Sequence, residues 1–228
     1  MQGSGVFPAL AVNAAWPWMA LAGLGAFHGL NPAMGWLFAV ALGFQRQSRG
    51  AVLQALLPIA AGHALSVAMV VVAISVLRIL FDITSLEIGA AIALIAFGLY
   101  RLLARHRGRV GMQVSGAQLL LWSFLMATAH GAGLMLIPVL LGMPIGAASS
   151  EHLQHMAAFS SLGPSVGIAL AALGVHTFAM LATAGAVAIV VYEWAGLAFL
   201  RRSWINIDLI WVFALVGAGV ILLIMALR

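Results

Sequence analysis

Phe27-His28-Gly29-Leu30-Asn31-Pro32 begins a pattern that the chain carries twice. The next histidine segment is Gly62-His63-Ala64-Leu65-Ser66, and the second half of the chain has Ala129-His130-Gly131-Ala132-Gly133 and Val175-His176-Thr177-Phe178-Ala179. We predict that each histidine lies near the middle of a hydrophobic, membrane-spanning segment. An ionisable side chain at that depth is costly and by default indicates a functional site. The sequence therefore predicts a membrane-embedded site built from a duplicated unit.

The composition is that of an integral membrane protein. Hydrophobic residues make up 64% of the chain and charged residues 7%, which leaves too little polar surface to coat a soluble globule. Because a membrane span needs roughly 20 apolar residues, the 228 residues can form about six helices in a single transmembrane domain, 1–228. We therefore expect the lipid bilayer to be a partner of most of the chain.

Two residue counts exclude further classes of protein. The chain has no cysteine, which excludes a structural disulfide, a thiolate metal site and a dithiol redox relay. Its ten basic residues are all arginines that cluster in the connections between helices, which is typical of topology signals. A nucleic-acid surface would need a basic face instead, so we expect no nucleic-acid partner.

The hydropathy pattern predicts an all-α fold of six helices, of which the first and the fourth are interrupted. Gly29 and Pro32 break the first helix. Gly131, Gly133 and Pro138 break the fourth. Because backbone groups freed by such breaks must be satisfied within hydrocarbon, we expect the breaks to line a protein interior. The helices are predicted at about 14–45, 51–79, 86–104, 115–142, 165–191 and 205–227.

The arginines predict the orientation of these helices. Eight of the ten fall in alternate connections or at the adjoining helix ends, and Arg78 and Arg228 are the exceptions. The positive-inside rule puts those connections in the cytoplasm and both termini outside. We expect a bacterial inner-membrane location, periplasmic termini and an external loop at about 143–164. The eight arginines are Arg46, Arg49, Arg101, Arg105, Arg107, Arg109, Arg201 and Arg202.

The two halves also correspond outside the histidine segments. Glu87 precedes Gly98 by eleven residues in the third predicted helix. Asp208 precedes Gly219 by the same eleven residues in the sixth. Each unit has three helices, so the second must insert upside down relative to the first, and inverted repeats with broken helices at the midplane are typical of secondary transporters. The predicted repeats cover about 14–104 and about 115–227.

Several roles are open to the histidines at the centre of these helices. Neutral imidazole is the commonest transition-metal ligand, and it also titrates near neutral pH and can relay protons. Alternatively, an intramembrane histidine can be structural and hydrogen-bond a carbonyl across a helix interface. Because four histidines share one depth, we predict a central metal site made of their side chains. These four are His28, His63, His130 and His176.

Other polar or soft side chains lie close to the histidines along the chain. A thioether selects softer metals such as Cu(I), although methionine in a hydrophobic chain also serves as packing filler. An amide or hydroxyl one turn from a histidine lies on the same helix face. These secondary candidates for the substrate path are Asn31, Met34, Ser66, Met135 and Thr177.

The predicted external loop carries a second group of candidates. If this loop is helical, His152 and His155 share one face. We expect the group to capture a cation at the entrance or exit of the transport path, and the alternative is a solvated polar loop. Its members are Glu151, His152, His155 and Met156.

The first histidine segment resembles a motif of a known transporter family. His28-Gly29-Leu30-Asn31-Pro32-Ala33-Met34, followed 35 residues after His28 by His63, is similar to the His-Gly-Leu-Glu-Pro-Gly-His segment and the later Ser-His-Thr motif of nickel/cobalt exporters. These exporters belong to the lysine-exporter superfamily. The resemblance implies six helices in two inverted halves, with a broken first helix.

The chain departs from that family at two positions of the motif. Asn31 stands at the family's acidic residue, and Met34 stands at its second histidine. The loss of a carboxylate and an imidazole weakens the case for a hard or borderline divalent ion. The thiol-disulfide conduits of the same superfamily require cysteines, which this chain lacks.

These observations together predict a membrane transporter, and not an enzyme, for a transition-metal cation such as nickel, cobalt, copper or zinc. Transport would proceed by alternating access around the four-histidine site. The chain has no ATP-binding motif, so a gradient or a partner protein would supply the energy.

Two alternatives from other classes stay open at this point. Four intramembrane histidines can hold two bis-histidine haems, which would make the chain a b-type haem membrane protein. The chain can also be a non-transporting subunit or assembly factor that binds a partner subunit in a membrane complex. A Soret band would favour the first alternative, and stable co-purification with an enzyme would favour the second.

The arginine pattern generates a topology prediction. Reporter fusions at residues 46–49, 105–110 and 200–203 should report a cytoplasmic location, because the arginines resist translocation. Fusions within 145–162 should report an external one. Any one of these connections on the opposite side would contradict the inverted-repeat interpretation.

Overall fold

The structure of the chain is a computed structural model that describes residues 15–103, 115–143, 154–195 and 207–228. It describes side chains over 15–103, 115–143, 166–194 and 209–228. All regular elements within these ranges are helical, as predicted, and none is a strand. They are α1 (Trp16–Leu30), η1 (Pro32–Met34), α2 (Trp36–Arg46), α3 (Arg49–Leu80), α4 (Ile83–Leu103), α5 (Gly116–His130), η2 (Leu134–Leu136), α6 (Ile137–Leu141), α7 (Gln154–Val190), η3 (Val191–Ala195) and α9 (Ile207–Ala226).

Most of the long helices are long enough to cross a membrane. Within the described ranges, four helices are long and apolar enough to cross a membrane: α3, α4 and the greater parts of α7 and α9. α5 and α6 together make a fifth candidate, which is bent by 52° at the break between them. The chain is therefore an integral membrane protein by helix length and hydropathy.

Two interrupted helices occur where the sequence predicts them. α1 ends at Leu30, a single 3-10 turn follows, and Gly35 with φ of 113° begins α2. α5 ends at His130, and Gly131 with φ of 69° turns the chain towards η2 and α6. Glycine adopts positive φ without the steric cost that other residues meet, so these two positions fix the breaks.

The helix boundaries differ from the predicted ones chiefly at α7. Of the other five predicted helices, each differs from the structure by at most three residues at either end. α7 begins at Gln154, eleven residues before its predicted start, so the predicted external loop at 143–164 is too long. Pro164 lies within this additional segment, and a single missing donor does not end a helix that continues on both sides.

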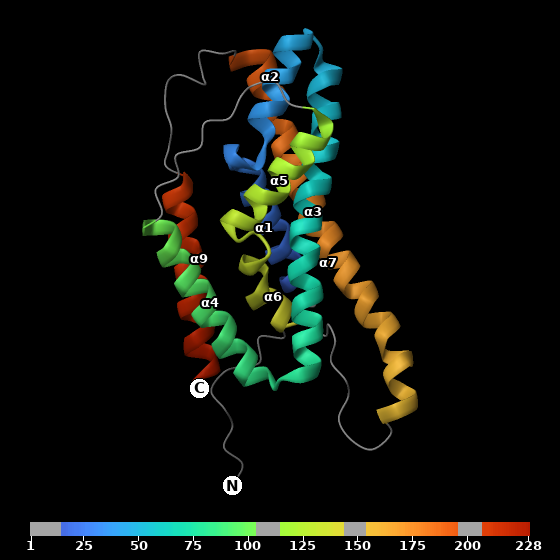
Figure 1. Cartoon of the computed structure of the whole chain (residues 1–228), viewed down its shortest axis with the longest axis vertical. Helices are drawn as coiled ribbons and strands as arrows, with labels where there is room; N and C mark the ends of the chain where they lie inside the picture. Colours follow the sequence, from blue (N-terminus) through green and yellow to red (C-terminus); the bar gives the residue numbers. More distant parts are fainter. Residues whose placement is uncertain (1–14, 104–114, 144–153, 196–206) are drawn as a thin grey trace.

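The helices pack in three main pairs (Figure 1). α1 lies along α7, α3 lies along α5, and α4 lies along α9. α3 runs almost the full height of the molecule, and the α2–α3 connection lies at the end opposite to the α3–α4 connection. Its 32 residues correspond to about 48 Å of helix, enough to cross a bilayer completely.

The α4–α9 pair has a reciprocal contact. A Cβ placed on Gly98 of α4 would lie 2.6 Å from Val216 of α9. A Cβ placed on Gly219 of α9 would lie 2.8 Å from Ile95 of α4. Val216 lies three residues before Gly219, and Ile95 lies three residues before Gly98, so the two contacts correspond. The two helices therefore present equivalent surfaces to each other.

Glycines also bring α1 against α7. A Cβ on Gly25 would overlap the carbonyl oxygen of His176, and one on Gly29 would overlap the carbonyl oxygen of Met180. Membrane helices approach this closely only where small residues expose their backbones. His28 lies between these two glycines in sequence, so the close approach places it beside α7.

Arg78, an exception to the arginine pattern, has a structural role. Its guanidinium donates hydrogen bonds to the carbonyl oxygens of Leu141 and Met143, and the second of these is 2.8 Å long. These carbonyls lie at the end of α6, where helical carbonyls lack intrahelical partners. Arg78 therefore ties the end of α3 to the end of α6.

Gly62→Ala should destabilise the protein, because a Cβ there would overlap the carbonyl oxygen of Leu120 in α5, and backbone cannot move aside cheaply. We expect a loss of about 1–3 kcal/mol, the usual cost of overpacking. The measurement is the thermal midpoint of the detergent-solubilised protein by size-exclusion chromatography. The matched control is Gly23→Ala, whose Cβ would meet nothing within 4 Å. Equal midpoints for the two variants would contradict the close α3–α5 contact.

Candidate functional site

Three histidines from three helices are in ring contact at the centre of the protein. The ring centroids of His28 and His63 are 5.4 Å apart, those of His28 and His176 are 4.9 Å apart, and those of His63 and His176 are 5.4 Å apart. α1, α3 and α7 supply them, and all three side chains are fully buried. We call these three residues the histidine cluster.

Backbone carbonyls fix the protonation of two members of the cluster. His28 Nδ1 lies 2.8 Å from the carbonyl oxygen of Leu24, and His176 Nδ1 lies 3.2 Å from that of Leu21. A carbonyl only accepts, so each Nδ1 donates, and the Nε2 of a neutral imidazole then carries the lone pair. Metal-binding histidines are commonly oriented in this way through their other ring nitrogen.

The remaining ring nitrogens of the cluster are unpaired. Nε2 of His28, Nε2 of His176 and both nitrogens of His63 are buried, and none has a hydrogen-bond partner among the residues that the structure describes. Most buried polar atoms in proteins are paired, and an unpaired one costs about 1–3 kcal/mol. A site with four such nitrogens is what a ligand-binding function would need.

His130, the fourth predicted ligand, lies at the break after α5 and is not a member of the histidine cluster. It is buried and is the last residue of α5 before the break. Its Nδ1 donates to the carbonyl oxygen of Met126 over 2.8 Å, one turn back, as His28 does to Leu24. The two histidines therefore have the same local geometry at the ends of their broken helices.

Trp211 joins His130 to the histidine cluster. Its indole Nε1 donates a hydrogen bond to the carbonyl oxygen of His130. Its ring meets His28 edge to face with centroids 4.2 Å apart and stacks on Phe27 at 5.0 Å. Trp211 is fully buried, so this residue of α9 contacts both broken helices at once.

The sequence alone did not single out Trp211. It is the fifth residue of α9, and tryptophan near the end of a membrane helix is usually found at the membrane interface. Only the packing of α9 against the two breaks shows that this indole is internal.

Two of the secondary candidates have unpaired polar atoms. Asn31 is buried, its Oδ1 accepts from the backbone nitrogen of Ala33 over 2.9 Å, and its Nδ2 has no partner among the described residues. Thr177 Oγ1 is likewise buried and unpaired within that part of the chain. Asn31 therefore stabilises the first break and retains a free donor, while Thr177 follows His176 directly.

Ser66 is used structurally. Thr128 Oγ1 donates to the carbonyl oxygen of Phe124 over 2.8 Å, which uses its proton. The 2.9 Å contact between Ser66 and Thr128 must therefore be donated by Ser66. Ser123 similarly donates to the carbonyl oxygen of Ile59 over 2.7 Å. These hydroxyls join α3 to α5.

The methionine candidates are buried in the interior. Met34 is 1% exposed and lies in the 3-10 turn of the first break. Met135 belongs to a hydrophobic cluster with Ile74, Leu94 and Trp211. For Met135 this is the environment of a packing residue.

The external candidates fall largely outside the described residues. Glu151 and His152 precede α7 and are not described. His155 and Met156 lie in the first turn of α7, and their side chains are also outside the description. The structure thus replaces the predicted loop at these two positions with helix.

The cluster is not arranged as a coordination site in this structure. Over the described ranges, no group of three or more histidine, cysteine, aspartate or glutamate side chains could hold a metal ion as it stands. The rings instead meet at interplanar angles of 68°, 80° and 17°. Rings in direct contact also leave no space between them for a haem macrocycle.

Comparison with known proteins gives no assignment. No protein-family model, no curated protein and no solved structure matches this chain. The fold and the helix lengths define its class, a helical integral membrane protein, and the function has to be argued from the site itself.

Ser66→Ala should cost about 1 kcal/mol of stability, the usual value of one hydrogen bond, because only the link to Thr128 is lost. Metal binding, measured by elemental analysis of the purified protein, should be unchanged. Ser75→Ala is a matched control, because Ser75 on the same helix donates only to the carbonyl oxygen of Val71 in its own helix. A loss of bound metal in Ser66→Ala alone would instead make Ser66 a ligand.

Proposed function

We propose that this protein is a membrane permease for a transition-metal cation, with the histidine cluster as its central site. The observation that carries the proposal is the set of four buried, unpaired ring nitrogens on His28, His63 and His176. In neutral rings three of these four nitrogens carry a lone pair, namely Nε2 of His28, Nε2 of His176 and one nitrogen of His63. Lone-pair nitrogens of imidazole bind nickel, cobalt, zinc and copper ions. Their burial, with His63 and His176 on two helices long and apolar enough to cross a membrane, fits a substrate and not a surface-bound ion.

Coordination would require a change in how the three rings lie relative to one another. At present they lie edge to face or stacked, and their lone pairs do not converge on one point. The carbonyl contacts of His28 and His176 restrict their rings, whereas His63 has no hydrogen bond to any residue that the structure describes. We therefore assign His63 as the ligand that moves when the cation binds.

We further propose that the chain crosses the membrane six times as two inverted three-helix repeats. The reciprocal contacts of Gly98 and Gly219 support this arrangement, because a twofold axis between α4 and α9 requires them. The pairing of helices supports it as well. α1 packs on α7 and α5 packs on α3, and these two pairs exchange under the same axis.

Alternating access would open the two ends of the protein in turn. At one end Arg49 forms an ion pair of 3.1 Å with Glu193, and Phe44 meets Tyr192 with ring centroids 5.1 Å apart. At the other end Arg78 holds the end of α6. Each contact joins one proposed repeat to the other, so each can serve as a closure. The arginine pattern puts the Arg49 end in the cytoplasm and both termini in the periplasm of a bacterial inner membrane.

The ligand atoms favour a borderline divalent ion over Cu(I). The cluster supplies nitrogen donors, which suit nickel, cobalt, zinc and Cu(II), and Met135 is taken up by hydrophobic packing. The resemblance to nickel/cobalt exporters adds less to this choice, because Asn31 and Met34 replace that family's acidic residue and second histidine. We place His130 and Asn31, at the two breaks, along the path to the cluster.

His63→Leu should abolish metal binding without loss of stability. Replacing an unpaired buried polar group by an apolar one of similar size is neutral or stabilising, so the thermal midpoint should hold or rise. Binding of Ni²⁺, Co²⁺ and Zn²⁺ is measured by isothermal calorimetry, and transport by uptake into proteoliposomes. His106→Ala, in the arginine-rich connection, controls for loss of a histidine outside the cluster.

Three results would contradict this function. Full metal binding and uptake by the His63→Leu variant would remove the cluster from the transport path. A Soret band in the purified wild-type protein would favour haem ligation. Stable co-purification with a membrane enzyme, in the absence of any uptake, would favour a role as a subunit or assembly factor.

A further inference from the structure

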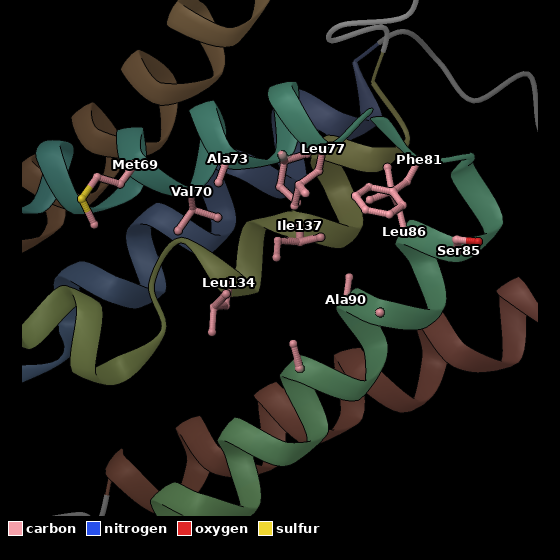
Figure 2. Close-up of a pocket in the computed structure, with 13 residues that line it drawn as sticks. Met69, Val70, Ala73, Leu77, Phe81, Ser85, Leu86, Ala90, Leu134 and Ile137 are labelled. Carbon is pink, nitrogen blue, oxygen red and sulfur yellow. The ribbon is translucent and has the colours of Figure 1, made fainter. Parts of the chain in front are cut away.

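An apolar groove separates α3 from α4 at the end of the molecule where these two helices connect. Its volume is about 520 Å³, within the range of about 300–1,000 Å³ that holds small ligands. α3 forms one wall, α4 the other, and residues of η2 and α6 form the floor (Figure 2). Leu134 and Ile137 are the floor residues, and they face the space between the walls.

The groove has the length and polarity of one bilayer leaflet. On α3 it extends from Met69 to Phe81 just past the helix end, which is about 18 Å at 1.5 Å per residue. One leaflet contributes about 15 Å of hydrocarbon, half of the whole core. Among the described residues that line the groove, Ser85 at the connection end is the one with a polar side chain, and Met69, Val70 and Leu134 form the opposite end.

The groove opens to the surroundings of the helices. The α4 wall is lined by small residues, among them Gly89 and Ala90, which leave the groove open on that side. A Cβ on Gly89 would meet nothing within 4 Å. Along the α3 side, Met69 is 50% exposed and Phe81 is 54% exposed. Both walls are helices long and apolar enough to cross a membrane, so we expect this opening to face lipid.

We propose that this groove binds one acyl chain of a bilayer phospholipid, with the glycerol end of the lipid at Ser85 and the methyl end at Met69. A membrane helix of the same length is about 10 Å across and would occupy roughly 1,400 Å³, so the groove could take up only part of one. The metal cation is an equally poor occupant, because the lining offers it a single hydroxyl. An acyl chain matches the length, the shape and the gradient of polarity.

The site is tested by photocrosslinking in vesicles of phosphatidylethanolamine and phosphatidylglycerol. Two diazirine phospholipids are used, one with the diazirine near the ester and one with it at the chain end. We expect the first to label Phe81 and Ser85 and the second to label Met69 and Val70, each several-fold more than the lipid-exposed Phe178 of α7. Labelling no stronger than that of Phe178, or without this order in depth, would overturn the proposal.

Two filling variants test the location. Gly89→Leu and Ala90→Phe should each abolish the labelling of Met69 and leave that of Phe178 unchanged. Gly89→Leu has open space for its side chain, so it keeps the test valid if Ala90→Phe does not fold. Persistent labelling of Met69 in a folded variant would contradict the assignment.

A last measurement separates lipid from water in the groove. The chain has no cysteine, so Ala93→Cys creates a unique thiol on the groove wall. A membrane-impermeant maleimide should not react with it in intact vesicles. Rapid reaction would show a water-filled vestibule and would overturn the proposal. The readouts do not involve metal, so they succeed or fail independently of the transport function.

Discussion

The contact of α1 with α7 through bare backbone is the constraint on which the centre of this protein depends. Gly25 and Gly29 leave room for the carbonyls of His176 and Met180, so the two helices touch on either side of His28. The same approach lets His176 reach the carbonyl oxygen of Leu21 on α1. With larger residues at the two glycines, the imidazoles of His28 and His176 could not meet. His63 of α3 would then have no histidine pair to contact. Close packing thus positions groups whose own mutual attraction is weak.

Inside hydrocarbon, polar groups have to be satisfied by the protein, and the structure shows where this is done and where it is not. Hydroxyls of Ser66 and Ser123 join α3 to α5, and Nδ1 atoms donate to carbonyls within or between helices. Among the described residues, four buried nitrogens without a partner lie on the histidine cluster, and others lie on Asn31, next to His28 in the first break, and on Trp122 of α5. The burial of these ring nitrogens is therefore not compensated by hydrogen bonds within the described residues, whereas that of the hydroxyls is.

Much of the fold could be predicted because helix length and hydropathy are local properties of the chain. The breaks at Gly131 and after Gly29 were readable for the same reason. The start of α7 was not, since continuation through Pro164 depends on neighbouring residues and not on the proline itself. In the site, burial of the histidines followed from their depth, but the contact of three rings, the separate place of His130 and the burial of Trp211 are tertiary facts. No spacing along the sequence encodes how α9 packs against two breaks.

The reciprocal contacts of Gly98 and Gly219 suggest one way in which such a protein can arise. In the α4–α9 pair, each helix contributes a glycine and, three residues before it, an aliphatic side chain that contacts the glycine of the other helix. Two copies of one sequence could therefore form this contact with each other. A three-helix chain with this surface could associate with a copy of itself lying the other way in the bilayer. Fusion of the two copies would then free each half to change alone, and in the proposed repeat Ala90 of α4 and the bulky Trp211 of α9 occupy corresponding positions.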